Sequence, residues 1–200
     1  MGLHSSFKIK IVYLFFDTET AGLPRNWKAS HLNYDNWPRL VQIAWIQYDE
    51  EGNVIDSQDF IIRPDGFKIP YKTAQIHGIT TARALKEGVD LVPVLEHFNQ
   101  KISESDNIVA HNVSFDERVM GAEFVRNNIA TELFEKKRIC TMKTTTTFCQ
   151  LPGSFGFKWP SLAELHYAVF ERDFVDAHNA KADIEATANS YWELKRRGFF

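Results

Sequence analysis

The sequence has few cysteines and no long apolar run. Its 200 residues include two cysteines, Cys140 and Cys149, which form no C-x-x-C pair, so neither a disulfide framework nor a thiolate zinc site is expected. No stretch reaches the roughly 20 consecutive apolar residues that a membrane-spanning helix needs, and the first residues lack the pattern of a secretory signal. We therefore expect a soluble, cytoplasmic protein with no membrane partner.

An excess of positive charge is also missing. The chain has 23 Lys and Arg against 26 Asp and Glu, which gives a formal net charge of −3. A protein that coats duplex nucleic acid through many phosphate contacts needs a strongly basic face, so this composition argues against that mode of binding. It does not exclude binding of nucleic acid through a metal ion.

The apolar content is sufficient for one substantial core. Hydrophobic residues make up 44% of the chain and aromatic residues 14%, and a chain of this length is expected to form a single domain over residues 1–200. The segment KIKIVYLFF predicts a buried central strand at about residues 8–17. The segments RLVQIAWIQYD and VIDSQDFIIRP predict two strands joined by a tight turn. Before them, LPRNWKASHLNYDNWP has no clear period and predicts an extended loop at about residues 24–39.

After this hairpin, helical and strand patterns alternate. Short strands are expected over NIVAH and RIC, and helices over YKTAQIHGIT, LVPVLEHFNQKI, TMKTTTTFCQ, SLAELHYAVF and NAKADIEATANSYWELKRR. Ser114 and Glu117 fit a capping box, so a further helix is expected to begin just beyond the NIVAH strand. This order predicts an α/β fold in which helices wrap a hairpin-bearing sheet.

The segment LFFDTET ends a buried strand with two carboxylates, Asp17 and Glu19. Side chains alternate across a strand, so both carboxylates share one face and converge near the strand's end. Two such groups repel each other, and a divalent cation between them keeps both ionised. Oxygen ligands of this kind suit Mg²⁺ or Mn²⁺ better than zinc. Taken alone, the pair is equally the mark of a strand that runs into solvent and ends in a turn.

Two acids from distant segments are candidates to join this pair. Asp116 is expected in the first turn of a helix that follows a strand, where simple complementarity to the helix dipole also explains it. Asp183 lies among alanines of the last predicted helix, where an isolated Asp usually faces solvent. His178 precedes Asp183 by five residues, so the two side chains share a centre only if His178 lies in the loop or first turn, with Asp176 or Asn179 as the N-cap.

Together, FFDTETAGL, AHNVSFDERV and HNAKAD resemble the three motifs of the DEDDh, or DnaQ-like, family of 3′–5′ exonucleases, over roughly residues 8–195. The resemblance implies an RNase H-like fold, a mixed sheet of about five strands with helices on both faces. It implies that Asp17, Glu19, Asp116 and Asp183 bind metal and that His178 is the general base. The segment after Leu23 departs from the family, in which proofreading domains have a compact turn here.

The resemblance also implies contacts with the terminal nucleotide. The IHGIT segment resembles a family segment beside that nucleotide, and Leu23 is the expected wedge against the last base, with a place in the hairpin core as the alternative. The expected substrate-binding residues are Thr20, Ala21, Leu23, His77, Asn112 and Phe115. Trp27, His31, Tyr34 and Trp37 of the extended loop form either a stacking platform for a single strand or a packed cluster that anchors the loop, and we favour the anchoring cluster.

The expected activity follows from this resemblance. It is a metal-dependent 3′–5′ exonuclease, with two divalent cations, Mg²⁺ or Mn²⁺, acting on single-stranded or frayed DNA and releasing nucleoside 5′-monophosphates, as in proofreading and DNA repair. A DNA polymerase or another replication protein is the implied partner. Two alternatives stay open: a 3′–5′ exonuclease of RNA or oligoribonucleotides, and an inactive module that binds nucleic-acid ends or proteins. The sequence does not determine the oligomeric state.

Overall fold

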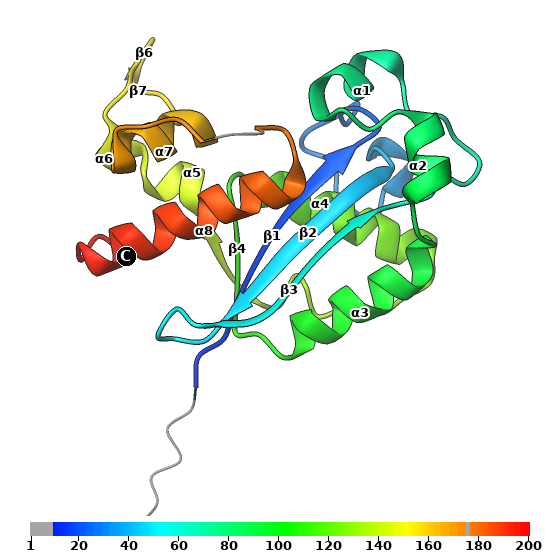
Figure 1. The fold of residues 1–200 in the computed structure, drawn as a ribbon, viewed down its shortest axis with the longest axis horizontal. Coiled ribbons are helices and arrows are strands. Elements are labelled where there is room, and N and C mark those ends of the chain that lie inside the picture. The colour runs from blue at the N-terminus through cyan, green and yellow to red at the C-terminus, as the bar shows by residue number, and fades with distance from the viewer. Residues whose placement is uncertain (1–9, 175–176) are drawn as a thin grey trace, which may run out of the picture.

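A five-stranded mixed sheet forms the centre of the computed structural model, which describes residues 10–174 and 177–200. The strand order is β3-β2-β1-β4-β5 (Figure 1). The strands are β1 (Tyr13–Thr20), β2 (Leu40–Tyr48), β3 (Val54–Ile61), β4 (Asn107–Ala110) and β5 (Lys137–Cys140). The first three pair antiparallel, whereas β4 runs parallel to both β1 and β5. The predicted hairpin and the mixed sheet are therefore confirmed.

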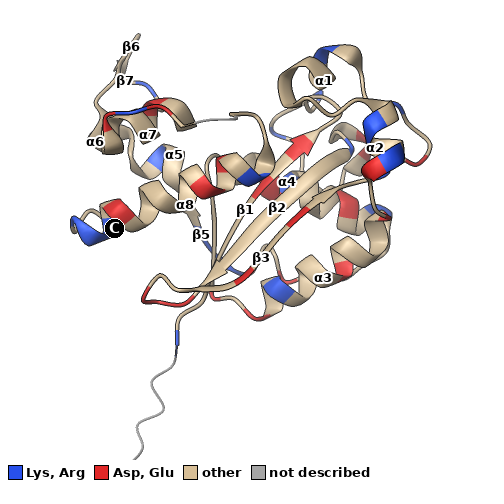
Figure 2. Cartoon of the chain, in the orientation of Figure 1, with Lys and Arg blue, Asp and Glu red and all other residues tan. Residues whose placement is uncertain are grey.

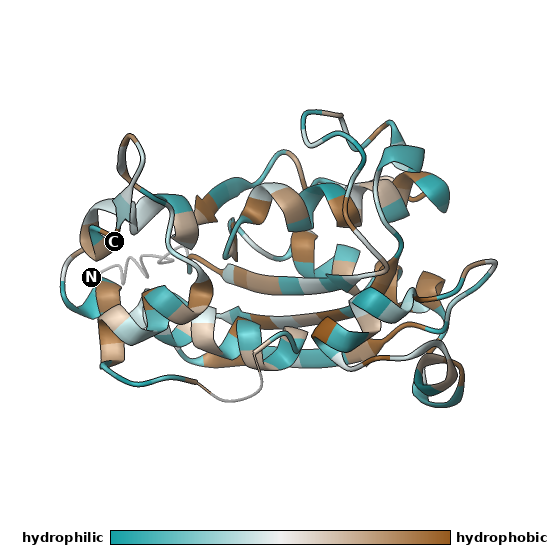
Figure 3. Cartoon of the chain, turned by 90° about the horizontal axis from the view of Figure 1, so that it is seen from above, coloured by the Kyte–Doolittle hydropathy of each residue, from teal (hydrophilic) through white to brown (hydrophobic). Residues whose placement is uncertain are grey.

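Helices lie on both sides of this sheet (Figure 3). In Figure 1, α8 crosses the front of the sheet and α4 lies behind it. The helices are α1 (Tyr71–His77), α2 (Thr81–Glu87), α3 (Leu91–Ser103), α4 (Val113–Arg126), α5 (Thr141–Thr144), α6 (Thr146–Cys149), α7 (Leu162–Phe170), α8 (Ala180–Arg196) and the 3-10 turn η1 (Tyr34–Asn36). A small separate hairpin, β6 (Pro152–Gly153) with β7 (Gly156–Phe157), precedes α7. Among the described helices, none combines the length and apolar character needed to cross a bilayer.

Strand β1 is apolar on both faces because each face packs against helices. Leu14 and Phe16 belong to the core cluster that α3 and α4 help to form. Tyr13 and Phe15 belong to a second cluster, which includes Tyr191 of α8. A strand covered on both sides reads as a continuous apolar run rather than an alternating one, which explains the YLFF sequence.

The position of β1 differs from the prediction. It begins at Tyr13 rather than near residue 8; residues 8 and 9 lie outside the described part of the chain. It continues to Thr20 because β2 pairs with it as far as Leu40, with a register shift between Glu19 and Thr20. The two carboxylates of the D-x-E motif therefore lie within the strand, and not beyond its end.

The capping box predicted for α4 is wrong. The N-cap is Asn112, in the left-handed conformation with φ 76°, which asparagine tolerates better than most residues. Ser114 lies inside the helix and its hydroxyl donates to Asn112 Oδ1 (3.2 Å). Glu117 pairs with Arg138 of β5 (3.3 Å) instead of capping. The helix still follows β4 directly, so Asp116 lies in its first turn as expected.

The remaining predictions for the second half are mostly confirmed. The strands over NIVAH and RIC and the helices α1, α3, α7 and α8 form where the patterns placed them. The TMKTTTTFCQ segment forms two short helices rather than one. They meet at Thr145, whose backbone leaves the helical region (φ −88°, ψ 5°). Its hydroxyl donates to the Thr141 carbonyl oxygen (2.8 Å), a local bond of the kind that competes with a regular helix.

Candidate active site

Three carboxylates converge beside the last residues of β1. Asp17 and Glu19 point from the same face of the strand, opposite Ala44 and Gln42 of β2, and Figure 2 shows acidic colouring at the arrowhead of β1. Asp183 reaches them from the first turn of α8. One oxygen from each of the three carboxylates lies within 4.8 Å of the other two. The structure therefore brings Asp17, Glu19 and Asp183 together, as the sequence predicted.

The alanines of α8 explain how Asp183 comes so close to the sheet. Ala180 and Ala188 are fully buried against β1 and β2, and small side chains allow the helix to lie close to the strands. The N–H of Ala180 also donates to the Gln42 side-chain oxygen (3.3 Å). Asn179 is the N-cap and accepts from the N–H groups of Lys181 and Ala182 (3.1 and 3.3 Å). The helix start is thus held against β2.

His178 lies in the turn that leads into α8. This is the position in which His178 and Asp183 were expected to reach the same site. Its backbone has φ 68°, and its N–H donates to both carboxylate oxygens of Asp183 (3.3 and 3.2 Å). Its imidazole is exposed. Of the two expected N-caps, Asn179 is confirmed and Asp176 lies outside the described residues.

Asp116 approaches from the other side of the sheet. Its side chain is buried, with 3% of the residue exposed. The hydroxyl and the backbone N–H of Thr18 both donate to Asp116 Oδ1 (2.8 and 3.2 Å). This part of Thr18 in orienting Asp116 was not predicted from the sequence. The available signal was its alternation with Asp17, which places it on the face that α4 covers.

Mutual repulsion and burial shift the ionisation of all four acids. Burial and the charges of Asp116, Asp183 and Glu19 hold the pKa of Asp17 well above its ordinary value. Burial, Asp183 and Asp116 raise the pKa of Glu19 to about 8. Burial raises the pKa of Asp116 to about 7 against the Thr18 hydrogen bonds. Burial raises the pKa of Asp183 to about 6, opposed by the positive charge of His178.

This donor set fits a divalent cation. Within the described residues, no lysine or arginine forms an ion pair with any of these four acids. Neighbouring carboxylates repel each other, and this repulsion raises their pKa values. A bound cation offsets the repulsion and keeps the carboxylates ionised. Asp17, Glu19 and Asp183 offer the converging oxygens, and Asp116 lies near enough to repel Asp17.

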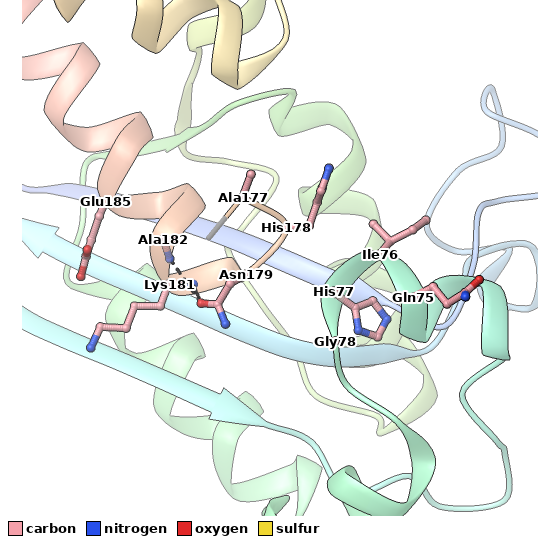
Figure 4. A pocket seen from close by; sticks show the side chains of 10 residues that line it. All are labelled: Gln75, Ile76, His77, Gly78, Ala177, His178, Asn179, Lys181, Ala182 and Glu185. Carbon is pink, nitrogen blue, oxygen red and sulfur yellow. Dashed lines mark hydrogen bonds between the residues drawn. The ribbon is translucent and has the colours of Figure 1, made fainter. Parts of the chain in front are cut away.

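A cleft of about 540 Å³ opens between α1 and the start of α8, and its lining includes Ala182, the residue before Asp183. Figure 4 shows His77 on the α1 side and His178 on the α8 side. His77 is buried, and its Nδ1 accepts from the N–H of Ile79 (3.1 Å). Its Nε2 has no hydrogen-bond partner among the described residues. Burial lowers the pKa of this imidazole, and the backbone carbonyl groups of Thr20 and His77 partly oppose that shift.

The other expected substrate-binding residues flank the same edge of the sheet. Leu23 is 72% exposed, so its alternative place in a hairpin core is wrong. The Thr20 hydroxyl donates to the Gly22 carbonyl oxygen (2.7 Å), and the Ala21 N–H donates to the Arg39 carbonyl oxygen (2.9 Å). Asn112 is the N-cap of α4, and Phe115, which directly precedes Asp116, is half-buried.

Comparisons with known proteins agree with this arrangement. A model of the RNase T exonuclease family matches residues 14–191. The PolC-type DNA polymerase III of Lactococcus lactis is 36% identical over 117 residues, which are 58% of this chain and 6% of the polymerase. The enzyme of the same name from Streptococcus pyogenes serotype M18 is 35% identical over 129 residues, 64% of this chain and 8% of that one. This chain thus spans less than a tenth of these relatives.

Solved structures share the fold. Escherichia coli exonuclease I in complex with a dA16 oligonucleotide superposes with a TM-score of 0.72 and 23% identity, over 93% of this chain and 41% of that one. The same enzyme with a dT13 oligonucleotide gives a TM-score of 0.74 and 24% identity, over 94% and 41% of the two chains. These neighbours have the RNase H-like fold that the sequence predicts.

Proposed function

This chain belongs to the RNase T family of exonucleases, of the DEDDh type, and we propose that it hydrolyses phosphodiester bonds at the 3′ end of DNA and releases nucleoside 5′-monophosphates. The observation that carries the proposal is the convergence of Asp17, Glu19 and Asp183, with Asp116 beside them. An inactive binding module has no need to keep four mutually repelling carboxylates at one edge of its sheet. Their electrostatic cost instead favours a working metal site.

We assign the cation-binding role to these four acids: Asp17, Glu19 and Asp183, whose oxygens converge, and Asp116 beside them would hold the ions. Two divalent cations, when bound, offset the charge of the phosphate and stabilise the attacking and departing oxygens. The hydrogen bonds from Thr18 to Asp116 fix one carboxylate oxygen, which leaves the second oxygen of Asp116 for the ion. Mg²⁺ or Mn²⁺ is the proposed metal because all the donors are carboxylate oxygens.

His178 is the proposed general base. Imidazole takes up protons near neutral pH and is the side chain most often used for this role. The exposed side chain of His178 lines the cleft (Figure 4). The two backbone hydrogen bonds from His178 to Asp183 hold its turn in place. In this role the imidazole would accept the proton of the attacking water.

The terminal nucleotide is proposed to lie between the cleft and the end of β1. His77 lines one side of the cleft, and the exposed side chain of Leu23 is available as a wedge against the last base. The backbone at Thr20 and Ala21, together with Asn112 and Phe115, completes the proposed contacts.

DNA is the proposed substrate because the similar proteins are DNA polymerases or an exonuclease solved with DNA. The similar sequences are segments of DNA polymerases, and the similar structures hold DNA oligonucleotides. The polymerase relatives also support a place in DNA replication or repair, beside a polymerase. RNA is the competing substrate, and it requires a contact with the 2′-hydroxyl.

The test uses 5′-labelled single-stranded DNA and RNA of one sequence, incubated with Mg²⁺, Mn²⁺ or EDTA. The proposal expects a ladder that shortens from the 3′ end, with DNA degraded faster, no reaction in EDTA and none with Asp17→Ala. Asp65→Asn is the matched control, because Asp65 is exposed and lines a different pocket, together with Arg63 and Asp90. Degradation of RNA alone would move the assignment to a ribonuclease. No metal-dependent cleavage of either polymer would overturn the proposal.

A further inference from the structure

The extended loop between β1 and β2 is fastened along its length to α4. Arg126 donates to the carbonyl oxygens of Tyr34 and Trp37. Trp37 is 3% exposed, and its indole N–H donates to the Ser30 carbonyl oxygen (3.1 Å). The Asn36 side chain bonds both to the N–H and to the carbonyl oxygen of Asn26 (2.7 and 2.9 Å). For these residues, the anchoring cluster that we favoured is correct.

A second attachment depends on a glycine in α4. The ring of His31 stacks on Phe134, with centroids 3.7 Å apart and planes at 11°. Gly121 lies under this pair: a Cβ there would come within 2.6 Å of Phe134 and 3.0 Å of His31. The loop is therefore attached to α4 at a second place, near Gly121, in addition to Arg126.

Trp27 is mounted on this rigid loop but is not buried in it. The residue is 51% exposed. Its ring centroid lies 5.7 Å from that of Phe115, the residue directly before Asp116. Its carbonyl oxygen accepts from Arg118 Nη1 of α4 (2.8 Å). Trp27 thus keeps an open aromatic surface against Phe115, the chain neighbour of Asp116, whereas Trp37 serves packing.

Positive charge flanks this surface. Arg25 and Lys28 are exposed, and neither forms an ion pair within the described part of the chain. Exposed cations beside an exposed aromatic ring are the features by which proteins hold single-stranded nucleic acid, because the ring stacks on a base and the cations meet phosphates.

We propose that Trp27 is a stacking residue for a base upstream of the terminal nucleotide, and that Arg25 and Lys28 contact the neighbouring phosphates. The occupant is a single strand of several nucleotides, since a base within a duplex cannot present its face to the indole. This inference rests on the proposed function: the strand whose 3′ end enters the carboxylate site continues over Phe115 to Trp27. A strand long enough to reach Trp27 should then bind more tightly than a shorter one.

The test compares oligothymidylates of two and of eight nucleotides. Binding of each, labelled at the 5′ end, is measured by fluorescence anisotropy in EDTA, and kcat and KM are measured with Mn²⁺. We expect Trp27→Ala to weaken binding of the longer strand at least about fivefold and to raise its KM, while the dinucleotide is unaffected. Trp27→Phe retains most of the affinity, because phenylalanine also stacks. Trp159→Ala, which removes another half-exposed indole, is the control.

Arg25→Ala combined with Lys28→Ala tests the phosphate contacts. The slope of log affinity against log salt is expected to fall by about 0.7 for each lost contact on a single strand. The same comparison with oligouridylate is expected to give the same effect, because stacking does not depend on the sugar.

Each outcome separates this inference from the proposed function. Equal behaviour of Trp27→Ala and the wild-type protein at both lengths overturns the role of Trp27 and leaves the exonuclease assignment intact. An equal loss with the dinucleotide also overturns it, because the residue would then act at the terminal nucleotide. A wild-type protein that neither binds nor cleaves any strand contradicts the proposed function itself.

Discussion

Thr18 and Asp116 are joined by a buried 2.8 Å hydrogen bond across 98 positions of the chain. Thr18 lies between the two acids of β1, and Asp116 belongs to the first turn of α4. The bond therefore couples the two faces of the sheet: the strand residue that points away from Asp17 positions the acid that α4 contributes. It also opposes the upward shift in the pKa of Asp116 that burial causes.

Thr18→Val tests this coupling. Valine keeps the shape and removes the hydroxyl, so we expect a loss of stability of about 1 kcal/mol, a higher pKa of Asp116 and at least a tenfold lower kcat at neutral pH. The pH at which activity reaches half its maximum should move upward. Thr18→Ser, which keeps the hydroxyl, should restore both values. An unchanged pH profile in the valine variant would show that the Thr18 hydroxyl does not act on Asp116 and that Thr18 contributes only to packing.

The raised pKa values predict how stability depends on pH. Glu19 has an ordinary pKa of 4.5 and a folded pKa of about 8. Between these values the folded state keeps a proton that the unfolded state releases, so the stability of the metal-free protein falls as pH rises through this window. A bound cation replaces that proton. We therefore expect the increase in Tm caused by Mn²⁺ to be larger near pH 8 than near pH 6.

This measurement needs one control, because other groups titrate in the same range. In EDTA, Glu19→Gln should flatten the fall in Tm with pH, since glutamine has no proton to lose. It should also reduce the increase in Tm that Mn²⁺ causes. A Mn²⁺ effect of the same size at both pH values would contradict the assignment of these acids to the metal.

Replacement of His178 by alanine should separate catalysis from metal binding. The proposed metal ligands are the four acids and do not include the His178 imidazole. The hydrogen bonds from His178 to Asp183 come from the backbone N–H, which alanine retains. General-base help is typically worth about 10²- to 10⁴-fold, so kcat should fall by that factor. Calorimetry should find Mn²⁺ affinity nearly unchanged. A variant that works at the wild-type rate from about pH 6 to pH 9 would remove His178 as the base.

Glu123 of α4 stabilises the fold beneath the site. It is fully buried, and its Oε1 accepts from Arg39 Nε and from the Leu40 N–H, each at 3.0 Å. Arg126 lies at 3.0 Å from the same oxygen. Removing one partner leaves buried charge unpaired, so Glu123→Ala should lower the free energy of unfolding by about 3–5 kcal/mol. Denaturant titration measures this, and Glu132→Ala, an exposed ion pair, should cost less than about 1 kcal/mol.

The sequence was sufficient for the parts of the fold that depend on local pattern. The continuous apolar run of β1, the hairpin, and the alanine face of α8 each carry their own signal, and the four acids lie in recognisable motifs. The failures concern pairing between distant segments. How far β1 extends depends on where β2 stops, and the start of α4 depends on the left-handed turn at Asn112 rather than on the Ser114 and Glu117 pattern.

The loop illustrates the same limit. Trp27 and Trp37 look alike in the sequence, and composition assigns both to packing. Helix α4 donates to the backbone carbonyl oxygen of each, so the difference lies in their side chains. Trp37 is 3% exposed and its indole N–H donates to the Ser30 carbonyl oxygen, whereas Trp27 is 51% exposed. The place of Thr18 is equally invisible locally, because its partner is 98 positions away.

The most direct test of the account is the identity of the first product from a 3′-end-labelled single-stranded DNA. In a single turnover with Mn²⁺, the wild-type protein should release the label as a nucleoside 5′-monophosphate, and Asp17→Asn should release none while remaining folded. Label that stays on a shortened polymer, or appears equally with Asp17→Asn, would contradict a 3′–5′ exonuclease that acts through this carboxylate site.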